Sequence, residues 1–227
     1  MSAAFSEKTD LARSEHLPSK GEASRDTILR TAARLATTKG LDGLSIGDLA
    51  AEVGMSKSGL YAHFKSKEDL ELATIELAFT IFDAEVLRPA IRAPAGSARL
   101  KALVNSFLSY LERGVFPGGC FFAAAAAEFD ARPGPARDRI VEAYDRWLGL
   151  LRECIVDAQT LGEIAAGADV DQAVFEVQAM IFGANFLFVM SNDPMRLAQA
   201  RRGVEGVLAR FAVVRAPKKK HLPRRSQ

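Results

Sequence analysis

The chain has 227 residues, of which 48% are hydrophobic and 26% are charged, an ordinary composition for a folded soluble protein. No window reaches the roughly 18 uninterrupted apolar residues of a membrane span. The start, MSAAFSEKTD, lacks the apolar core of a secretory signal. The two cysteines, Cys120 and Cys154, are too few for a disulfide framework. We therefore expect a cytoplasmic protein that has no membrane partner.

The net charge of +2 hides an uneven distribution along the chain. Residues 22–67 carry 7 basic and 5 acidic side chains, residues 68–214 carry 14 basic and 20 acidic ones, and residues 215–227 carry 6 basic and none acidic. This pattern predicts a mobile arm (1–21), a mildly basic unit that would meet polyanions (22–67), an acidic body (68–214) and a basic disordered tail (215–227). The tail either adds nonspecific affinity for a polyanion or is a solvated end without a role.

Apolar residues at helical spacing run through the chain, and alternating β-branched runs are missing. The sequence therefore predicts an all-α fold of about nine helices. Gly40, Gly54 and the Pro-Gly-Pro sequence at 133–135 mark helix ends. The expected helices cover residues 23–39, 46–53, 56–64, 67–87, 97–115, 120–132, 136–162, 170–191 and 194–213.

The stretch SIGDLAAEVGMSKSGLYAHFKSK, residues 45–67, predicts two short helices joined by a glycine turn, followed by the start of a third. Ser45, Ser56 and Ser66 stand at the N-cap positions of the three helices. Leu60 and Phe64, four residues apart, form the buried side of the second helix. Its opposite side is small, polar and basic, which is typical of a helix that lies in the major groove of DNA.

Each side chain on this face suits a DNA contact. Gly59 lets the backbone approach base edges, Ser58 and Lys57 can hydrogen-bond bases, and Ala62 can touch a thymine methyl. Tyr61 and His63 lie on the flanks, where phosphates pass, and Ser45 and Lys67 lie at helix starts that favour phosphate oxygens. Taken singly, Tyr61 could be a core residue, His63 an ordinary surface residue and the serines simple caps.

The longer stretch ILRTAARLATTKGLDGLSIGDLAAEVGMSKSGLYAHFKSKEDL, residues 28–70, resembles the DNA-binding domain of the TetR family of bacterial transcriptional repressors. The resemblance implies a homodimer that binds two half-sites of a palindromic operator and responds to a small-molecule inducer. At matching positions, base contacts would come from Lys57, Ser58, Gly59 and Ala62, and phosphate contacts from Ser45, Tyr61, His63 and Lys67. Many members carry an aromatic residue or a histidine where Ala62 stands, so the base read there stays open.

The last two expected helices suit a dimer interface, since this family builds a four-helix bundle from them and their partners. The helix at 170–191 is apolar nearly all round, which fits a helix covered by its own domain and by a partner. A simple internal helix is the alternative. The residues expected at the interface are Val174, Val177, Ile181, Phe188, Val204, Val207, Leu208 and Phe211.

Aromatic side chains are concentrated in the middle of the body, where we expect the inducer to bind. The residues expected at this site are Phe82, Phe107, Cys120, Phe121, Trp147, Phe182 and Phe186. Few acidic residues fall within these stripes, so an apolar or aromatic inducer is favoured over a cation. Core packing of the same residues is the alternative interpretation.

Cys120 suggests a second kind of sensor. It follows Gly118 and Gly119 and opens a helix, where a helix N-terminus lowers the pKa of a thiol. Some TetR-like repressors that sense electrophiles or oxidants are similar in having a cysteine after glycine at this helix start. A redox- or electrophile-sensing repressor is therefore an alternative, as is a Cys120 that is only a small buried residue. Cys154 is expected to be structural.

The leading hypothesis is a ligand-responsive repressor, with a transcriptional activator as an alternative. An enzyme is disfavoured because the sequence has no HExxH, no glycine-rich phosphate loop and no paired cysteine or histidine motif. We accordingly expect no metal and no cofactor. The three histidines, His16, His63 and His221, fall in the arm, the reading helix and the tail. A DNA-binding structural protein without a sensor remains open, although the body exceeds what dimerisation needs.

Overall fold

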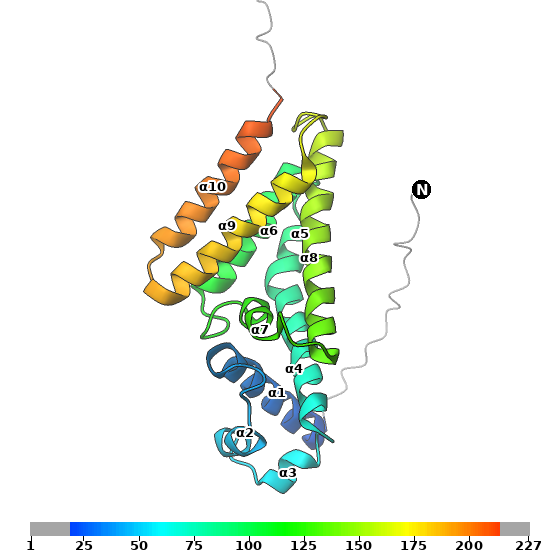
Figure 1. The fold of residues 1–227 in the computed structure, drawn as a ribbon, viewed down its shortest axis with the longest axis vertical. Coiled ribbons are helices and arrows are strands. Elements are labelled where there is room, and N and C mark those ends of the chain that lie inside the picture. Colours follow the sequence, from blue (N-terminus) through cyan, green and yellow to red (C-terminus); the bar gives the residue numbers. More distant parts are fainter. Residues whose placement is uncertain (1–18, 214–227) are drawn as a thin grey trace, which may run out of the picture.

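The computed structural model describes residues 19–213, which form an all-helical molecule (Figure 1). The helices are α1 (Lys20–Lys39), α2 (Ile46–Glu52), α3 (Lys57–Tyr61), α4 (Lys67–Phe82), the π-helix η1 (Asp83–Leu87), α5 (Arg88–Ile91), α6 (Ser97–Glu112), α7 (Phe121–Phe129), α8 (Pro135–Thr160), α9 (Val170–Ser191) and α10 (Met195–Phe211). Because α4, η1 and α5 follow one another without a break, they count as one helix. The described residues then hold nine helices, which confirms the expected fold class.

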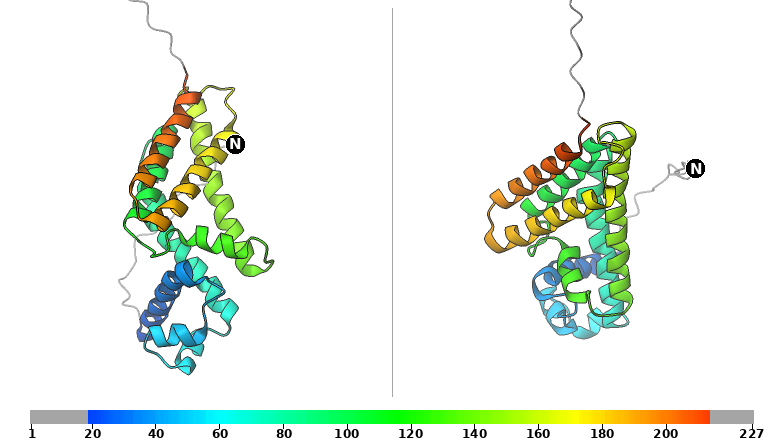
Figure 2. Two further views of the ribbon diagram at one scale, coloured as in Figure 1. Left: turned by 60° about the vertical axis from the view of Figure 1, so that its left-hand side comes forward. Right: turned by 45° about the horizontal axis from the view of Figure 1, so that its top comes forward.

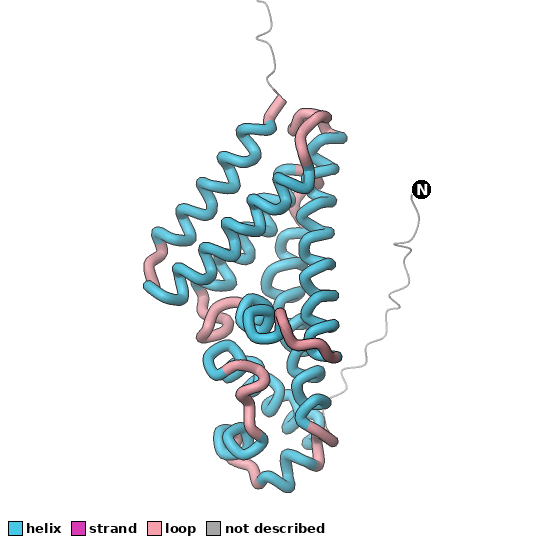
Figure 3. The backbone as a smooth tube through the Cα atoms, viewed as in Figure 1, coloured by secondary structure: helices cyan, strands magenta, loops and turns pink. Residues whose placement is uncertain are grey.

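Within residues 19–213 no strand is present, as Figure 3 shows. A single antiparallel bridge pairs Ile164, after α8, with Ala212, after α10. The basic tail expected at 215–227 and nearly all of the arm expected at 1–21 lie outside the described residues.

Helices α1 to α3 form one end of the molecule, which we call the reading unit, and α4 runs from that end into the body formed by the remaining helices (Figures 1 and 2). In the body, α10 packs along α9, while α9 also packs on α8 and α6. Helix α7 lies between α1 and the body and contacts both α1 and α8 (Figure 1). Helix α4 also packs on α1.

Local sequence signals account for most helix ends. Helix α1 begins three residues earlier than expected because Ser19 and Glu22 form a capping box. The Ser19 amide donates to Glu22 Oε2 at 2.8 Å, and the Glu22 amide donates to Ser19 Oγ at 3.3 Å. The α9 bounds agree with the expected 170–191, and its final turn ends at Asn192, which has a φ of +50°.

The helix that contains Pro89 continues to Ile91, although the sequence predicted that it would end before the proline. Proline lacks an N–H group, and its ring crowds the carbonyl four residues earlier. The preceding residues relieve this crowding by forming the wider η1 turn, in which the Arg88 amide donates to the Asp83 carbonyl five residues back. The π-helical turn therefore lets one continuous helix contain a proline.

One continuous apolar core runs from the reading unit into the body. In the reading unit, Ile28 and Ala32 of α1 are fully buried together with Leu49 and Leu60 of the two short helices. Helix α9 is long and apolar enough to cross a membrane by length and composition alone. Its apolar side chains pack against α6, α8 and α10 in the body.

Candidate DNA-reading face and ligand pocket

The helix-turn-helix is held in place from behind by apolar packing and at its ends by serine caps. Leu60 and Phe64 are buried, as the four-residue spacing predicted. Ser45 Oγ accepts the Asp48 amide at 3.0 Å, and Ser56 Oγ accepts the Gly59 amide at 3.1 Å. Gly54 makes the turn with a φ of +68°, a conformation that glycine adopts freely. Caps, turn and core together leave the opposite side of α3 exposed.

The predicted base-reading residues lie together on this exposed side. Lys57, Ser58 and Ala62 are exposed, and Gly59 is partly buried. A Cβ added at Gly59 would lie 3.2 Å from Ser56 Oγ, so the glycine also keeps room for the helix cap. The Ser58 hydroxyl is 3.0 Å from Ser56 Oγ. The face is small and polar, and it can approach a groove closely.

The predicted phosphate-contacting residues divide into two groups. Tyr61 is 55% exposed, which excludes the alternative that it is a core residue, and His63 is half-buried beside Phe64. The Lys67 side chain is exposed but pairs with Asp42: its ammonium donates to the Asp42 carbonyl and lies 2.6 Å from Asp42 Oδ1. A phosphate contact by this side chain would compete with that ion pair.

A network of charged groups ties the reading unit to the body. Arg132, just after α7, lies 2.6 Å from Asp42 Oδ2. Hydrogen bonds from Lys67 and Arg132 lower the pKa of the Asp42 carboxyl. On α7 itself, Glu128 accepts the Leu41 amide at 2.6 Å and the Asp42 amide at 2.9 Å. Residues about ninety positions apart in sequence are thus joined at the loop that leads into α2.

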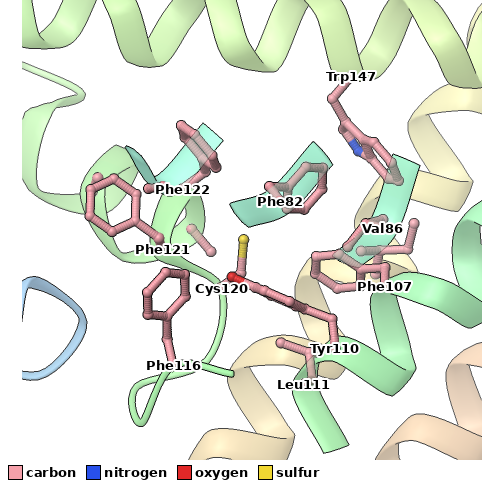
Figure 4. Packing of buried hydrophobic residues seen from close by; sticks show 14 of the residues in the cluster. Phe82, Val86, Phe107, Tyr110, Leu111, Phe116, Cys120, Phe121, Phe122 and Trp147 are labelled. Atoms are coloured by element: carbon pink, nitrogen blue, oxygen red, sulfur yellow. The ribbon is translucent and has the colours of Figure 1, made fainter. Parts of the chain in front are cut away.

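A cavity of about 340 Å³ lies in the body among α4, α6, α7, α8 and α9. Aromatic rings dominate its wall, and several meet edge to face, as Phe82 and Trp147 do with ring centroids 5.6 Å apart. Figure 4 shows the Cys120 sulfur pointing into the space between Phe82 and Phe122. The size and apolar lining are typical of a small-molecule site.

Five of the seven residues predicted for the inducer site line this cavity: Phe82, Phe107, Cys120, Trp147 and Phe182. The other two do not. Phe121 is fully buried and packs against Phe116 and Phe122, while Phe186 is 58% exposed on α9. Aromatic content alone could not separate the residues that line the cavity from those that do not.

The sequence interpretation left several lining residues out of the site, including Phe79, Phe122, Tyr144, Arg146, Gln178 and Asn185. Spacing could have found those on α9, since Gln178, Phe182 and Asn185 recur at three or four residues and share one helix face. The polar members carry the hydrogen-bonding capacity of the pocket. Trp147 Nε1 donates to Gln178 Oε1 at 2.8 Å, and the Cys120 amide donates to Asn185 Oδ1 at 2.8 Å.

Cys120 does not have the lowered pKa that its place at a helix start predicted. Burial raises the pKa of the thiol from 9.0 to about 11, and this effect exceeds the opposing hydrogen bonds from the amides of Ala123 and Phe122. Cys154 is also buried, and burial raises its pKa to about 11. Burial therefore favours the neutral thiol of Cys120 in the pocket wall, which argues against a reactive sensor cysteine.

The residues predicted for the dimer interface lie mostly in the core of their own chain. Val177 and Ile181 on α9, and Val204 and Val207 on α10, are at most 3% exposed; Val174 and Leu208 are also buried, and Phe188 and Phe211 are partly buried. A helix that is apolar on most sides does not show in its sequence which side faces its own chain. The exposed apolar stripe of α9 consists instead of Phe175, Ala179, Phe182, Phe186 and Met190.

Two family models match the chain over regions that agree with this architecture. The model of bacterial regulatory proteins of the tetR family matches residues 28–74, and the model of the tetracyclin repressor-like C-terminal domain matches residues 96–204. The chain therefore belongs to the TetR family, as the sequence resemblance implied. Proteins of this family are DNA-binding transcriptional regulators and not enzymes, which confirms the expectation that this chain is a regulator.

Two named relatives match stretches of very different length. The HTH-type transcriptional regulator YerO of Bacillus subtilis is 42% identical over 52 residues, which cover 23% of this chain and 18% of YerO. The repressor DhaR of Mycobacterium sp. is 21% identical over 140 residues, or 62% of this chain and 69% of DhaR. The match thus spans less than a fifth of YerO and about two thirds of DhaR.

Solved structures extend the likeness to nearly the whole described chain. A TetR transcriptional regulator from Chloroflexus aurantiacus has a TM-score of 0.79 and 27% identity, covering 85% of this chain and 98% of that one. A transcriptional regulator from Saccharomonospora viridis, solved in complex with choline, has a TM-score of 0.68 and 26% identity, covering 85% and 99%.

The raised pKa of Cys120 predicts slow alkylation. At pH 7.5 a shift from 9.0 to about 11 leaves about 100-fold less thiolate, the species that reacts with iodoacetamide. In a Cys154→Ala variant, which isolates Cys120, alkylation should be at least that much slower in the folded protein than in denaturant, and should accelerate as the pH approaches 11. Rapid labelling of the folded variant at pH 7.5 would restore the reactive-sensor interpretation.

Proposed function

We propose that this protein is a ligand-responsive repressor that binds a palindromic operator as a homodimer in the cytoplasm and is released by a small apolar or aromatic inducer. The observation that carries this proposal is the position of α4. It begins beside the reading helix at Lys67, and further along it lines the cavity with Phe79 and Phe82. A molecule in the cavity would therefore contact α4, the same helix that leads from the reading unit into the body.

Helix α7 offers a second connection. Cys120, Phe122 and Ala123 line the cavity, while Glu128 near the other end of the helix holds the loop between α1 and α2. Half-sites on DNA have a fixed spacing, so a small displacement of either reading unit would weaken binding by a dimer. Binding of the inducer and of the operator would then oppose each other through a shared two-state element.

Repression is favoured over activation by the relative DhaR, which is named a repressor. An apolar inducer is favoured by the aromatic wall of the cavity. The choline bound to the Saccharomonospora viridis regulator suggests a cationic inducer as the competing class, because aromatic rings also bind quaternary ammonium groups. The only carboxylate in the wall, however, is the exposed Glu153, and Arg146 from the same helix offsets its charge.

The exposed stripe of α9 supports the homodimer. Phe175, Phe186 and Met190 are 68%, 58% and 73% exposed, and they fall on one face of a helix that also packs along α10. An apolar patch of this kind marks an interaction surface. A second copy that places the same stripe against it would bury both in a symmetric four-helix contact.

Operator binding tests the proposal as a whole. We expect the protein to bind a specific site, first sought upstream of its own gene and otherwise selected from random DNA. Lys57→Ala should lose about 1–3 kcal/mol of specific binding because a base contact disappears. Fluorescence anisotropy against scrambled competitor DNA measures this loss, and Lys101→Ala, an exposed lysine on α6, serves as the matched control. Equal affinity of both variants for the operator would refute the reading face.

The dimer has its own test. Phe186→Asp places a charge in the centre of the exposed stripe and should yield a monomer at micromolar concentration in sedimentation experiments, since an unpaired charge is costly to bury. Ile91→Asp is the control, because Ile91 is 62% exposed but lies at the end of α5, away from the stripe. Dimers of unchanged stability in the Phe186 variant would show that the interface lies elsewhere.

A further inference from the structure

We infer that the ligand of this pocket is a neutral, largely apolar molecule that carries a carbonyl oxygen, which the side-chain amides of Gln178 and Asn185 bind as hydrogen-bond donors. The inference rests on the proposed function, because it names the chemical class of the inducer at that site. It rests on the orientation of these two side-chain amides, because the aromatic wall alone does not show which polar group a ligand carries.

Both amide orientations are determined by their partners. An indole N–H and a backbone N–H can only donate, so the atom that faces each of them must be the amide oxygen. Gln178 Oε1 therefore receives Trp147 Nε1, and Asn185 Oδ1 receives the Cys120 amide, both at 2.8 Å. Each oxygen already accepts one hydrogen bond, and the NH₂ group lies on the opposite side of each amide.

These NH₂ groups make no hydrogen bond to any other described residue, although both side chains line the cavity. Asn185 is 8% exposed as a residue, but among the described residues only Tyr110 and Arg196 hold a fully buried side-chain atom without a partner, so the Asn185 NH₂ nitrogen keeps access to the open space of the cavity. An acceptor oxygen on a ligand that displaces water there would take up the free donors of either amide.

Other polar groups of the wall reinforce the same preference. Burial raises the pKa of the Tyr144 hydroxyl, which keeps it protonated and able to donate. The Cys120 thiol is likewise protonated. The charged groups, Arg146 and Glu153, are both exposed, and the Arg146 guanidinium carbon lies 4.4 Å from the centroid of the Phe79 ring. The interior thus offers donors to a neutral ligand, while the two opposite charges at the edge offset each other.

The spacing of the donors adds a geometric condition. Gln178 and Asn185 are seven residues apart, two turns of α9, which corresponds to about 10 Å along the helix. A ligand with a single carbonyl would bind one amide and place its apolar part along the aromatic wall. A longer ligand with an acceptor at each end could reach both.

The test compares two probes that differ in one atom group. 2-Acetylnaphthalene carries a carbonyl, and 2-isopropenylnaphthalene replaces it with an isosteric C=CH₂ group; a trimethyl(naphthyl)ammonium ion serves as a cationic probe. Isothermal titration calorimetry on the full chain gives the ratio of the Kd of the alkene to that of the ketone. We expect this ratio to exceed one in the wild-type protein, despite the stronger hydration of the ketone.

Two variants keep each amide oxygen but remove its NH₂ donors. Gln178→Glu and Asn185→Asp still accept from Trp147 and Cys120, and they present acceptor oxygens to the cavity in place of the NH₂ groups. The Kd ratio should fall about fivefold or more in at least one of them, the value of one lost hydrogen bond. Gln178 is only partly buried, so its variant should fold even if Asn185→Asp does not. Gln199→Glu, exposed on α10, is the control for added charge and should leave the ratio unchanged.

An unchanged ratio in both variants would overturn the inference. Binding of the ammonium probe alone would overturn it in favour of a cation site, and failure of all three probes to bind would exclude this ligand class. Operator binding is measured on the same preparations without probe. Its loss would contradict the proposed function, whereas intact operator binding with a failed probe test would contradict only the ligand class.

Discussion

The carboxylate of Glu128, at the end of α7, ties the loop after α1 to the body, beside the packing of α1 on α4 and α7. Glu128 accepts two consecutive amides, Leu41 and Asp42, just past the C-terminus of α1. The preceding Gly40 has a φ of +83°, and a Cβ there would lie 2.9 Å from Glu128 Oε1. A side chain at residue 40 would push the carboxylate away. The loop can therefore dock closely only because glycine occupies this position.

The same helix forms part of the pocket, so the docking contact and the cavity share one structural element. At the start of α7 the Cys120 amide is bound by Asn185 from α9, and a Cβ on Gly119 would lie 2.5 Å from that side-chain oxygen. Helix α7 is thus held by α9 at one end and holds the reading unit at the other. Together with α4, it gives a ligand two routes by which to act on the spacing of the DNA-binding helices.

The sequence predicted the fold and the reading face well because both depend on local signals. Serine caps, the turn at Gly54 and the spacing of Leu60 and Phe64 each act within a few residues, and a family resemblance covers the same stretch. The pocket and the apolar stripe depend on which side of a helix faces inward. Most positions on α9 are apolar, so the sequence does not show that Val177 is buried while Phe175 is 68% exposed. The expected lowering of the Cys120 pKa fails for a related reason, because burial raises this pKa by more than the helix start lowers it.

The most direct test of this account is the operator affinity of Glu128→Gln, which places an amide NH₂ against backbone amides that need an acceptor. Glu163→Gln is the matched control, because Glu163 Oε2 also accepts a backbone amide, that of Ser97 at 2.9 Å, but within the body. We predict that Glu128→Gln binds the operator about tenfold more weakly than wild type, while Glu163→Gln binds it with wild-type affinity. Equal operator affinities for both variants would show that the α7 contact does not position the reading unit.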